Sequence, residues 1–304
     1  MKRPLLFTPL LLLAFSVAAK PPPKVVASIA PIHSLVASVT GEALTPELLM
    51  PPGSTPHSYA LRPSGAGTLA EAELVIWIGE NLESVLAKPL ASLGAEARKL
   101  GLMESIGVSH LPARRAGIWA GQEPYADSHG HGNGDPHLWL APANARAFVD
   151  AIATVLAEVD PERKALYRAN ADRTRQRIDA LESDIRRRLE PVKAQPYLVF
   201  HDAYQHFEQA FELGSIGAIV EDPEHHPGAR RLAAVRQSVR ERGVRCVFSE
   251  PQFRSSVVDL IMEGSGARHG VLDPVGSKLS PGPDLWFELM ENLTDSLVSC
   301  LAPE

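Results

Sequence analysis

A long charged helix in the middle of the chain constrains the fold more than any other feature. Residues 160–190 read DPERKALYRANADRTRQRIDALESDIRRRLE, with Asp160 as the expected cap, Pro161 at the first helical position and Pro191 after the end. At 1.5 Å per residue this helix is about 45 Å long, the length of a whole domain. It could lie on the surface of one domain, but its length and central position favour a helix that joins two lobes.

This helix is predicted to bury only a narrow face. Apolar side chains recur at helical spacing on an otherwise charged rod: Leu166, Ile178, Leu181, Ile185 and Leu189. Such a pattern predicts a helix that packs along one stripe and meets solvent elsewhere.

Short apolar strands alternate with helical stretches on both sides of this helix. The runs KVVASIA at 24–30 and ELVIWIG at 73–79 precede it, and YLVFHD at 197–202 and RCVFSEP at 245–251 follow it. This alternation predicts parallel sheets with helices on both faces and ligand sites at the carboxyl ends of strands. The predicted fold class is α/β, with two parallel-sheet lobes arranged as an N-terminal lobe at 24–159, the linking helix at 160–190 and a C-terminal lobe at 191–304.

The first nineteen residues have the pattern of a secretory signal. MKRPLLFTPLLLLAFSVAA has a basic start at Lys2 and Arg3, an apolar middle, and small residues ending at Ala19. The apolar run is too short to span a bilayer comfortably, which argues against a membrane anchor. Of the 30 Lys and Arg residues, 28 remain after cleavage against 36 Asp and Glu. The exported chain is therefore acidic, which argues against nucleic-acid binding.

The two cysteines, Cys246 and Cys300, both lie in the last quarter of the chain. In an oxidising compartment an even pair favours a disulfide, although two soft metal ligands are the alternative. A bridge would attach the C-terminal helix to a buried strand, and closing this loop is worth about 4 kcal/mol in the chain-entropy treatment.

Four candidate ligands stand where predicted strands end. His57 lies in the proline-rich loop MPPGSTPHSYALRPS, His137 in DPHLWLAP, His201 at the end of YLVFHD, and Asp273 after HGVL. Each alone is weak evidence, since a histidine near a strand end often has only a structural hydrogen bond. Two of them come from each half, however, at the sheet edge where an α/β lobe presents its ligands.

The chain resembles a known family from about residue 24 to its end. The motifs that carry the resemblance are MPPGSTPHSYALRPS, DPHLWLAP, VFHDAYQHFEQAFEL, CVFSEPQF and VLDPVG. They are similar to the ligand-bearing motifs of periplasmic zinc-binding proteins of high-affinity zinc-uptake ABC transporters. That family has two α/β lobes joined by one rigid helix, with the metal in the cleft between the lobes.

The resemblance implies a ligand set and a function. His57, His137 and His201 would be the zinc ligands, and Asp273 the carboxylate that faces the fourth position. Cys246 would pair with Cys300. The protein would bind Zn²⁺ in the periplasm as a monomer and deliver it to the membrane permease of an ABC importer, without enzymatic activity. Three imidazoles and one carboxylate suit four-coordinate zinc.

Three alternatives remain open at this stage. By resemblance, manganese-binding receptors of the same family carry two histidines and two carboxylates, with Glu at the position of His201. Three histidines with a vacant position also describe catalytic zinc in an exported hydrolase, although no HExxH or nucleophile-elbow motif is present. An extracellular adhesion protein is compatible with the fold.

A second, weaker metal site is predicted in the glycine-rich stretch PYADSHGHGNGD. His129 and His131 lie in it and could capture zinc, or the stretch is a solvated linker; both possibilities stay open. His225 and His226 could join this site, with a plain surface turn as the alternative.

Two further residues are candidates for orienting a ligand. His206 follows His201 on the next helix. Glu250 ends a predicted strand, and it could instead cap a helix.

Overall fold

The computed structural model describes residues 20–114, 117–118, 134–220, 223, 227–253 and 256–303. The predicted signal at 1–19 lies outside these residues, as do the predicted secondary-site residues His129, His131, His225 and His226. Among the helices that are described, none is long and apolar enough to cross a membrane.

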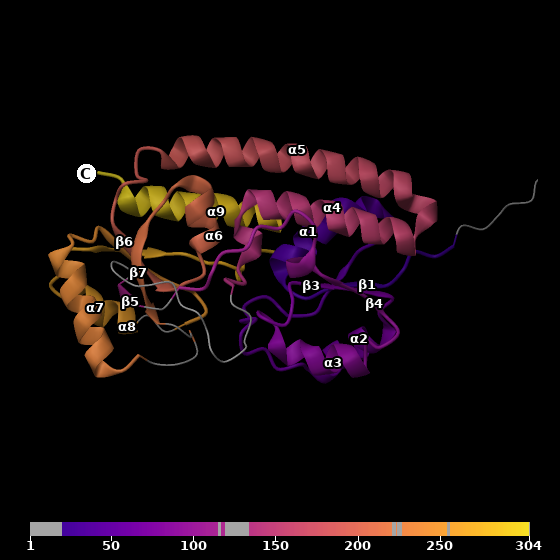
Figure 1. Ribbon diagram of the computed structural model, residues 1–304, viewed down its shortest axis with the longest axis horizontal. Helices are drawn as coiled ribbons and strands as arrows, with labels where there is room; N and C mark the ends of the chain where they lie inside the picture. The colour runs from indigo at the N-terminus through magenta and orange to yellow at the C-terminus, as the bar shows by residue number, and fades with distance from the viewer. Residues whose placement is uncertain are drawn as a thin grey trace, which may run out of the picture.

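The first sheet is parallel, as predicted, and lies in the right half of Figure 1. Its strands run in the order β2-β1-β3-β4, with bounds β1 (Val25–Ala27), β2 (Glu47–Leu48), β3 (Leu74–Trp77) and β4 (Arg98–Gly101). The central strands β1 and β3 are almost entirely buried. Helix α1 (Ala30–Thr40) lies above the sheet, and α2 (Pro63–Glu71) and α3 (Ala87–Ser92) lie below it (Figure 1).

The second sheet is parallel except at one edge. Its strands run in the order β5-β7-β6-β8-β9, with bounds β5 (Gly117–Ile118), β6 (Tyr197–His201), β7 (Ser215–Val220), β8 (Cys246–Ser249) and β9 (Arg268–Val271). Its helices are α6 (Gln205–Phe211), α7 (Ala229–Glu241) and α8 (Ser256–Met262). All neighbours pair in parallel except β5, which is antiparallel to β7.

Strand β5 joins the second sheet although it precedes the linking helix. It falls within the range 24–159 that was predicted as the N-terminal lobe, yet it pairs with β7. Arg114, shortly before it, donates to the carboxylates of Asp202 (2.8 Å) and Glu208 (2.9 Å), which belong to the second half of the chain. The chain therefore reaches the second sheet before the linking helix begins, and the predicted lobe boundaries stay predictions.

A layer of long helices spans both sheets. It contains α4 (Pro142–Val159), α5 (Lys164–Leu189) and α9 (Leu285–Leu301). Helix α5, preceded by a 3-10 turn at Pro161–Arg163, runs along the top of Figure 1 from one lobe to the other. A long helix that joins the lobes is thus confirmed, and α5 lies within the predicted range 160–190, with α4 packed against it as the other arm of a hairpin.

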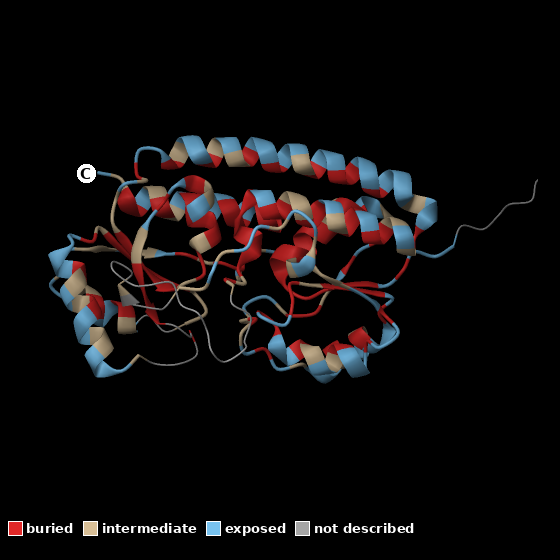
Figure 2. Ribbon diagram, in the orientation of Figure 1, coloured by how far each residue is buried: buried red, intermediate tan, exposed pale blue. Residues whose placement is uncertain are grey.

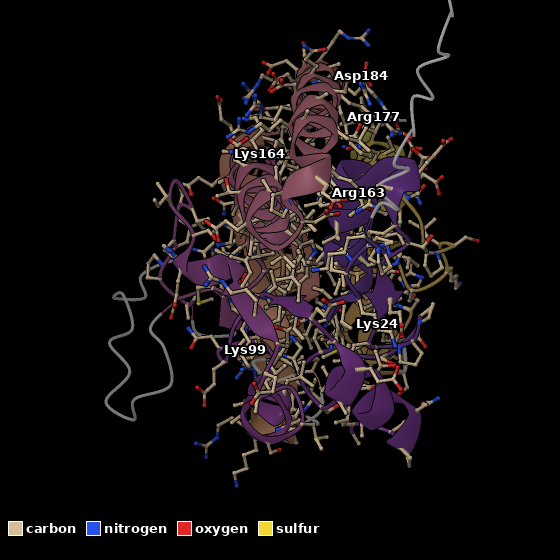
Figure 3. All side chains as sticks on the ribbon, turned by 90° about the vertical axis from the view of Figure 1, so that its right-hand side faces the viewer. Lys24, Lys99, Arg163, Lys164, Arg177 and Asp184 are labelled. Carbon is tan, nitrogen blue, oxygen red and sulfur yellow. A yellow bond between two sulfur atoms is a disulfide. The ribbon has the colours of Figure 1, made fainter. Side chains whose placement is uncertain are left out.

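The corner between α4 and α5 is held by a buried carboxylate. Asp160 was expected to cap the helix, and it occupies the N-cap position of the 3-10 turn at Pro161–Arg163, but its side chain makes no capping hydrogen bond. Its side chain instead accepts hydrogen bonds from the guanidinium of Arg163 (2.9 Å) and the hydroxyl of Tyr167 (2.7 Å). Figure 3 views the molecule from this end, with Arg163 and Lys164 labelled near the corner. The two hydrogen bonds to Asp160 therefore stabilise the turn between α4 and α5.

The buried stripe of α5 differs from the prediction at one residue. Ile178, Leu181, Ile185 and Leu189 are buried, as expected, but Leu166 is 41% exposed. Tyr167 is buried in its place, because it lies eleven residues before Ile178, close to three full turns of 3.6 residues, whereas Leu166 points about 120° away from Ile178. Figure 2 shows the helix buried on the side facing the molecule and exposed on the other.

Two buried tryptophans connect the lobes by hydrogen bonds. The indole of Trp286 in α9 donates to the carbonyl of Trp139 (2.9 Å), and the indole of Trp139 donates to the carbonyl of Pro274 (2.7 Å). The backbone N–H of Trp286 donates to the hydroxyl of Ser34 in α1 (2.9 Å). These bonds place the segments that follow His137 and Asp273 side by side.

The disulfide between Cys246 and Cys300 is present, which confirms the predicted pairing. It joins β8 to α9, with the two Cα atoms 6.1 Å apart. The C-terminal helix is therefore covalently attached to the second sheet.

A buried acid in the first lobe makes stability depend on pH. Glu83 is fully buried and accepts hydrogen bonds from the backbone N–H groups of Ile78 (2.9 Å) and Gly79 (3.1 Å). Burial raises the pKa of its carboxyl from 4.5 to about 7, and these N–H groups and Ser28 oppose the rise only in part. Between pH 4.5 and pH 7 the carboxyl of Glu83 is protonated in the folded state and ionised in the unfolded state. The free energy of unfolding therefore falls as pH rises through this range.

We expect Glu83→Gln to remove most of this decrease in unfolding free energy with rising pH. The parent should lose about 3 kcal/mol of unfolding free energy as pH rises from below 4.5 to above 7, because each pKa unit is worth about 1.4 kcal/mol. The glutamine variant, which can still accept from both N–H groups, should lose much less. Urea unfolding of both proteins at pH 5 and pH 8 measures the difference. Equal pH dependence in the two would show that Glu83 is not the responsible group.

Candidate metal centre

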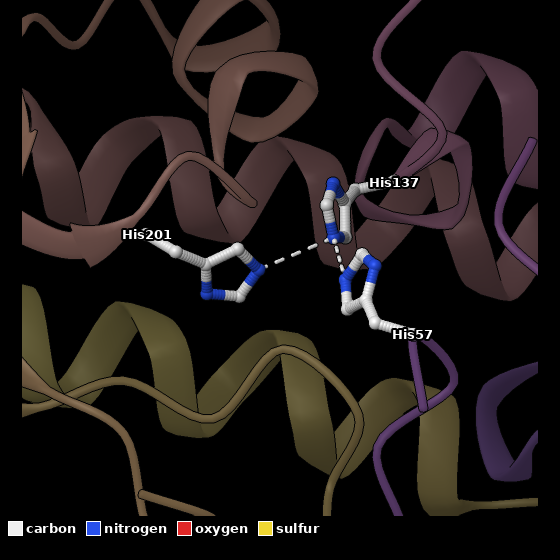
Figure 4. Close-up of side chains that lie close together, drawn as sticks. All are labelled: His57, His137 and His201. Atoms are coloured by element: carbon white, nitrogen blue, oxygen red, sulfur yellow. Dashed lines mark hydrogen bonds between the residues drawn. The ribbon is translucent and has the colours of Figure 1, made fainter. Parts of the chain in front are cut away.

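Three histidines from distant parts of the chain meet at one point between the lobes. His57, His137 and His201 each offer one nitrogen, and these atoms lie within 4.8 Å of one another. The Nε2 atom of His137 is 3.3 Å from Nε2 of His57 and 3.4 Å from Nε2 of His201 (Figure 4). Tetrahedral zinc with Zn–N bonds of 2.0–2.1 Å requires about 3.3–3.4 Å between nitrogens. The spacing therefore matches zinc.

Each histidine is positioned by the element before or after it. His201 is the last residue of β6, and His57 lies in the loop that follows β2. His137 directly precedes a 3-10 helix at Leu138–Leu140, whose three side chains are fully buried. His137 and His201 are each 4% exposed, whereas His57 is half-buried. The structure therefore brings together the three histidines that were predicted as zinc ligands.

Two carboxylates orient two of the imidazoles. His137 Nδ1 lies 2.7 Å from Asp135 Oδ1, and His201 Nδ1 lies 2.6 Å from Glu250 Oε1. A carboxylate accepts the Nδ1 proton and leaves the Nε2 lone pair directed at the common point. The metal-binding tautomer is thus set in advance for both rings.

Sequence reasoning found one of these carboxylates and missed the other. Glu250 was considered for orienting a ligand, and the structure places it in that position on His201. Asp135, the last residue of PYADSHGHGNGD, was not predicted to orient a ligand. The motif DPH could have indicated this role, because it places a carboxylate two residues before a histidine. From there the carboxylate can reach Nδ1 of the ring, here at 2.7 Å.

His206 supports the same arrangement from α6. Its Nε2 atom lies 3.2 Å from the backbone carbonyl of Asp135, and its side chain is buried. It therefore holds the backbone of the residue that orients His137. The secondary-site histidines, His129, His131, His225 and His226, lie outside the described residues, and their role stays a sequence prediction.

The electrostatic surroundings of the two buried rings differ. Burial, followed by the charges of His201 and His206, lowers the pKa of His137 well below its usual value. For His201, burial also opposes the charged form, but the negative charge and hydrogen bond of Glu250 outweigh it and raise the pKa. His137 is therefore neutral in this environment, with its Nε2 lone pair available.

Asp273, the predicted carboxylate for the fourth position, is engaged in a turn. Its Oδ1 accepts from the side-chain amide of Gln252 (2.8 Å) and from the backbone N–H groups of Val275 (3.2 Å) and Gly276 (3.0 Å). Its Oδ2 accepts from the backbone N–H and the hydroxyl of Ser277, both at 2.7 Å. Among the described residues, Asp273 is not part of the cluster that the three histidines form.

The cavity at the histidine cluster is the size of an ion. Its volume is about 10 Å³, roughly that of one water molecule. Besides the histidines and Glu250, its walls include Gln252, Phe253 and Val275. Asp273 lines a different hollow, beside α9.

Comparison with known proteins identifies related sequences and folds. A family model described as "Zinc-uptake complex component A periplasmic" matches residues 25–300. The high-affinity zinc uptake system protein ZnuA of Brucella suis biovar 1 (strain 1330) is 37% identical over 305 residues, with 91% of each chain covered. A crystal structure of ZnuA superposes with a TM-score of 0.79 at 23% identity, covering 92% of this chain and 100% of that chain. The SBP FpvC of Pseudomonas aeruginosa, in complex with Mn²⁺, has a TM-score of 0.79 at 22% identity, covering 93% and 99%.

These similarities carry different weight. The two solved structures are 23% and 22% identical to this chain, so they establish the shared fold and not the metal. The family model, in contrast, spans nearly the whole described chain, and the Brucella relative matches most of it. The chain therefore belongs to the family of periplasmic zinc-uptake complex component A proteins, the ZnuA family.

Proposed function

We propose that this protein is a periplasmic solute-binding protein that captures Zn²⁺ with His57, His137 and His201. It delivers the ion, as a monomer, to the membrane permease of an ABC zinc importer. The observation that carries the proposal is the meeting of three imidazoles, in which Nε2 of His137 lies at tetrahedral zinc spacing from Nε2 of His57 and of His201. Family membership and the predicted signal at 1–19 support the location and the partner.

The donor set favours zinc over manganese. Imidazole nitrogen suits zinc, whereas manganese prefers oxygen donors and a higher coordination number. The position of His201, which by resemblance is Glu in manganese receptors, here adds a third imidazole. FpvC has the same fold with Mn²⁺ bound, so the donors and not the fold carry this argument.

The cavity argues against the hydrolase alternative. Pockets for small molecules typically enclose about 300–1,000 Å³. The volume at the three histidines, about 10 Å³, is that of an ion or one water molecule and lies far below this range.

The lobes on the two sides of the linking helix share the ligands. His57 and His137 lie in the range 24–159, and His201 lies in 191–304. A small separation of the lobes would remove one of three imidazoles from the ion. This division supports a receptor that both holds zinc and releases it.

A metal titration tests the proposal. We expect metal-stripped mature protein to bind one zinc ion tightly, and to prefer zinc when zinc and manganese compete for it. Calorimetry with a competing chelator measures both. The same preparation should not hydrolyse ester, peptide or phosphate probes. Failure to bind zinc, or an equal affinity for both metals, would reject the proposed function.

A further inference from the structure

We infer that the side-chain oxygen of Gln252, rather than the carboxylate of Asp273, supplies the fourth ligand of the metal site. The inference rests on zinc binding at the three histidines as proposed above, and it adds one residue to that site. It follows from which oxygen atoms at the cavity still have free lone pairs.

The carboxylate of Asp273 has no lone pair left for a metal. An ionised carboxylate offers about four lone-pair positions on its two oxygens. Asp273 accepts five hydrogen bonds at 2.7–3.2 Å, three on Oδ1 and two on Oδ2. Four of the five come from Val275, Gly276 and Ser277, so the carboxylate holds the turn that follows it. Binding a metal would require this turn to open.

The amide of Gln252 is in the opposite situation. Its nitrogen donates to Asp273 Oδ1 at 2.8 Å, which fixes the orientation of the amide, because two oxygens would repel each other at that distance. Its oxygen, Oε1, must then point away from Asp273. That oxygen is buried, and no donor among the described residues reaches it. Gln252 lines the same cavity as the three histidines, whereas Asp273 does not.

Thr55 and Glu250 also bring side-chain oxygens to the cavity wall. The hydroxyl oxygen of Thr55 accepts from the backbone N–H of His57 at 3.4 Å. Glu250 has one buried oxygen, Oε2, without a partner among the described residues, but its carboxylate lies at the wrong edge of a ligand ring, with Oε1 2.6 Å from Nδ1 of His201. The three histidines meet through their Nε2 atoms, which lie on the other side of the imidazole. Glu250 therefore orients His201, and Gln252 is the residue left to contact the ion.

The hydrogen bond to Asp273 makes the Gln252 oxygen a better ligand. A negative acceptor on the amide N–H draws electron density toward the carbonyl oxygen, since hydrogen bonds in series polarise one another. Asp273 thus acts on the metal through Gln252, as a positioning residue. The ion would meet three neutral imidazoles and one neutral amide, so the nearest negative charges would be the carboxylates of Asp135 and Glu250 behind two of the imidazoles.

Three substitutions separate the oxygen of Gln252 from its other properties. Gln252→Leu removes the oxygen and the amide N–H at similar volume. Gln252→Glu keeps an oxygen, replaces the amide N–H that contacts Asp273 by a second oxygen and adds a negative charge. Gln205→Leu is the matched control, because Gln205 Oε1 is likewise buried with no partner among the described residues, yet Gln205 does not line the histidine cavity.

Zinc affinity of the full mature protein, measured by chelator competition, decides the question. We expect Gln252→Leu to weaken zinc binding by about 10-fold to 100-fold. Gln252→Glu should bind within about 3-fold of the parent, and Gln205→Leu should be unchanged, since ligand loss is what lowers the affinity. Thermal unfolding of each variant checks that it is folded.

Three results would overturn the inference while the parent still binds zinc. Parent-like affinity in Gln252→Leu would show that the oxygen is not a ligand. A Gln252→Glu variant as weak as Gln252→Leu would assign the effect to the contact with Asp273. An equal loss in Gln205→Leu would assign it to packing. Failure of the parent itself to bind zinc would instead reject the proposed function.

Discussion

Replacing His137 with alanine is expected to lower zinc affinity by about 100-fold or more. A structural zinc site is worth about 10–16 kcal/mol from four ligands, so one ligand accounts for about 3 kcal/mol, and each 1.4 kcal/mol is tenfold. His137 is the ring whose Nε2 lies closest to both other ligands, at 3.3 Å from His57 and 3.4 Å from His201. Its removal also leaves Asp135 buried without its imidazole partner.

The matching experiment compares four alanine variants by chelator competition. His57→Ala and His201→Ala should show losses of the same order as His137→Ala. His33→Ala is the control, because His33 is also a buried histidine, 6% exposed, but bonds the carbonyl of Pro46 and not the cluster. It should change thermal stability and leave zinc affinity unchanged. Parent-like zinc binding by any of the three cluster variants would remove that residue from the site.

Removing the disulfide is expected to destabilise the protein by about 4 kcal/mol. Cys246 and Cys300 are 54 residues apart, and a cross-link of that span restricts the unfolded chain by about this amount. The bond also holds α9, whose Trp286 donates to Trp139 next to the metal site. Urea unfolding of the parent and of Cys246→Ser/Cys300→Ser measures the loss.

Two controls accompany the disulfide experiment. A thiol reductant should destabilise the parent by a similar amount and leave the double serine variant unaffected. Zinc affinity of the folded double variant should equal that of the parent, because neither sulfur belongs to the histidine cluster. A loss of zinc binding in the folded variant would revive the alternative in which the cysteines are metal ligands. Unchanged stability would contradict the cross-link argument.

The sequence predicted those helices and strands whose defining residues all lie within one short segment of the chain. The linking helix at 160–190 could be recognised because capping residues, prolines and charge all lie within the segment, and α5 lies within that range. The buried stripe was correct from Ile178 onward and wrong at Leu166, which is exposed. One residue changes the direction of a helical side chain by about 100°, and only the packing of α5 on its neighbours shows which direction is inward.

The position of one histidine could also be predicted from the fold class, because a parallel strand presents the residue at its carboxyl end to a ligand site. That histidine is His201, at the end of β6. The motifs shared with zinc-uptake receptors added His57 and His137 to the same set. The fourth position could not be predicted in this way, because a motif places Asp273 in the chain without showing which donors surround its oxygens.

The sequence by itself therefore determined the α/β class, the linking helix and the disulfide partners, and it singled out the three histidines that the fold brings together. The tertiary structure alone decided that β5 joins the second sheet, that Asp135 and Glu250 orient the rings, and that Asp273 is engaged by Gln252 and its own turn. The physical reason is the range of the interactions. Periodicity and capping act within one segment, whereas a hydrogen-bond partner is set by the position and orientation of atoms that folding brings together from distant segments.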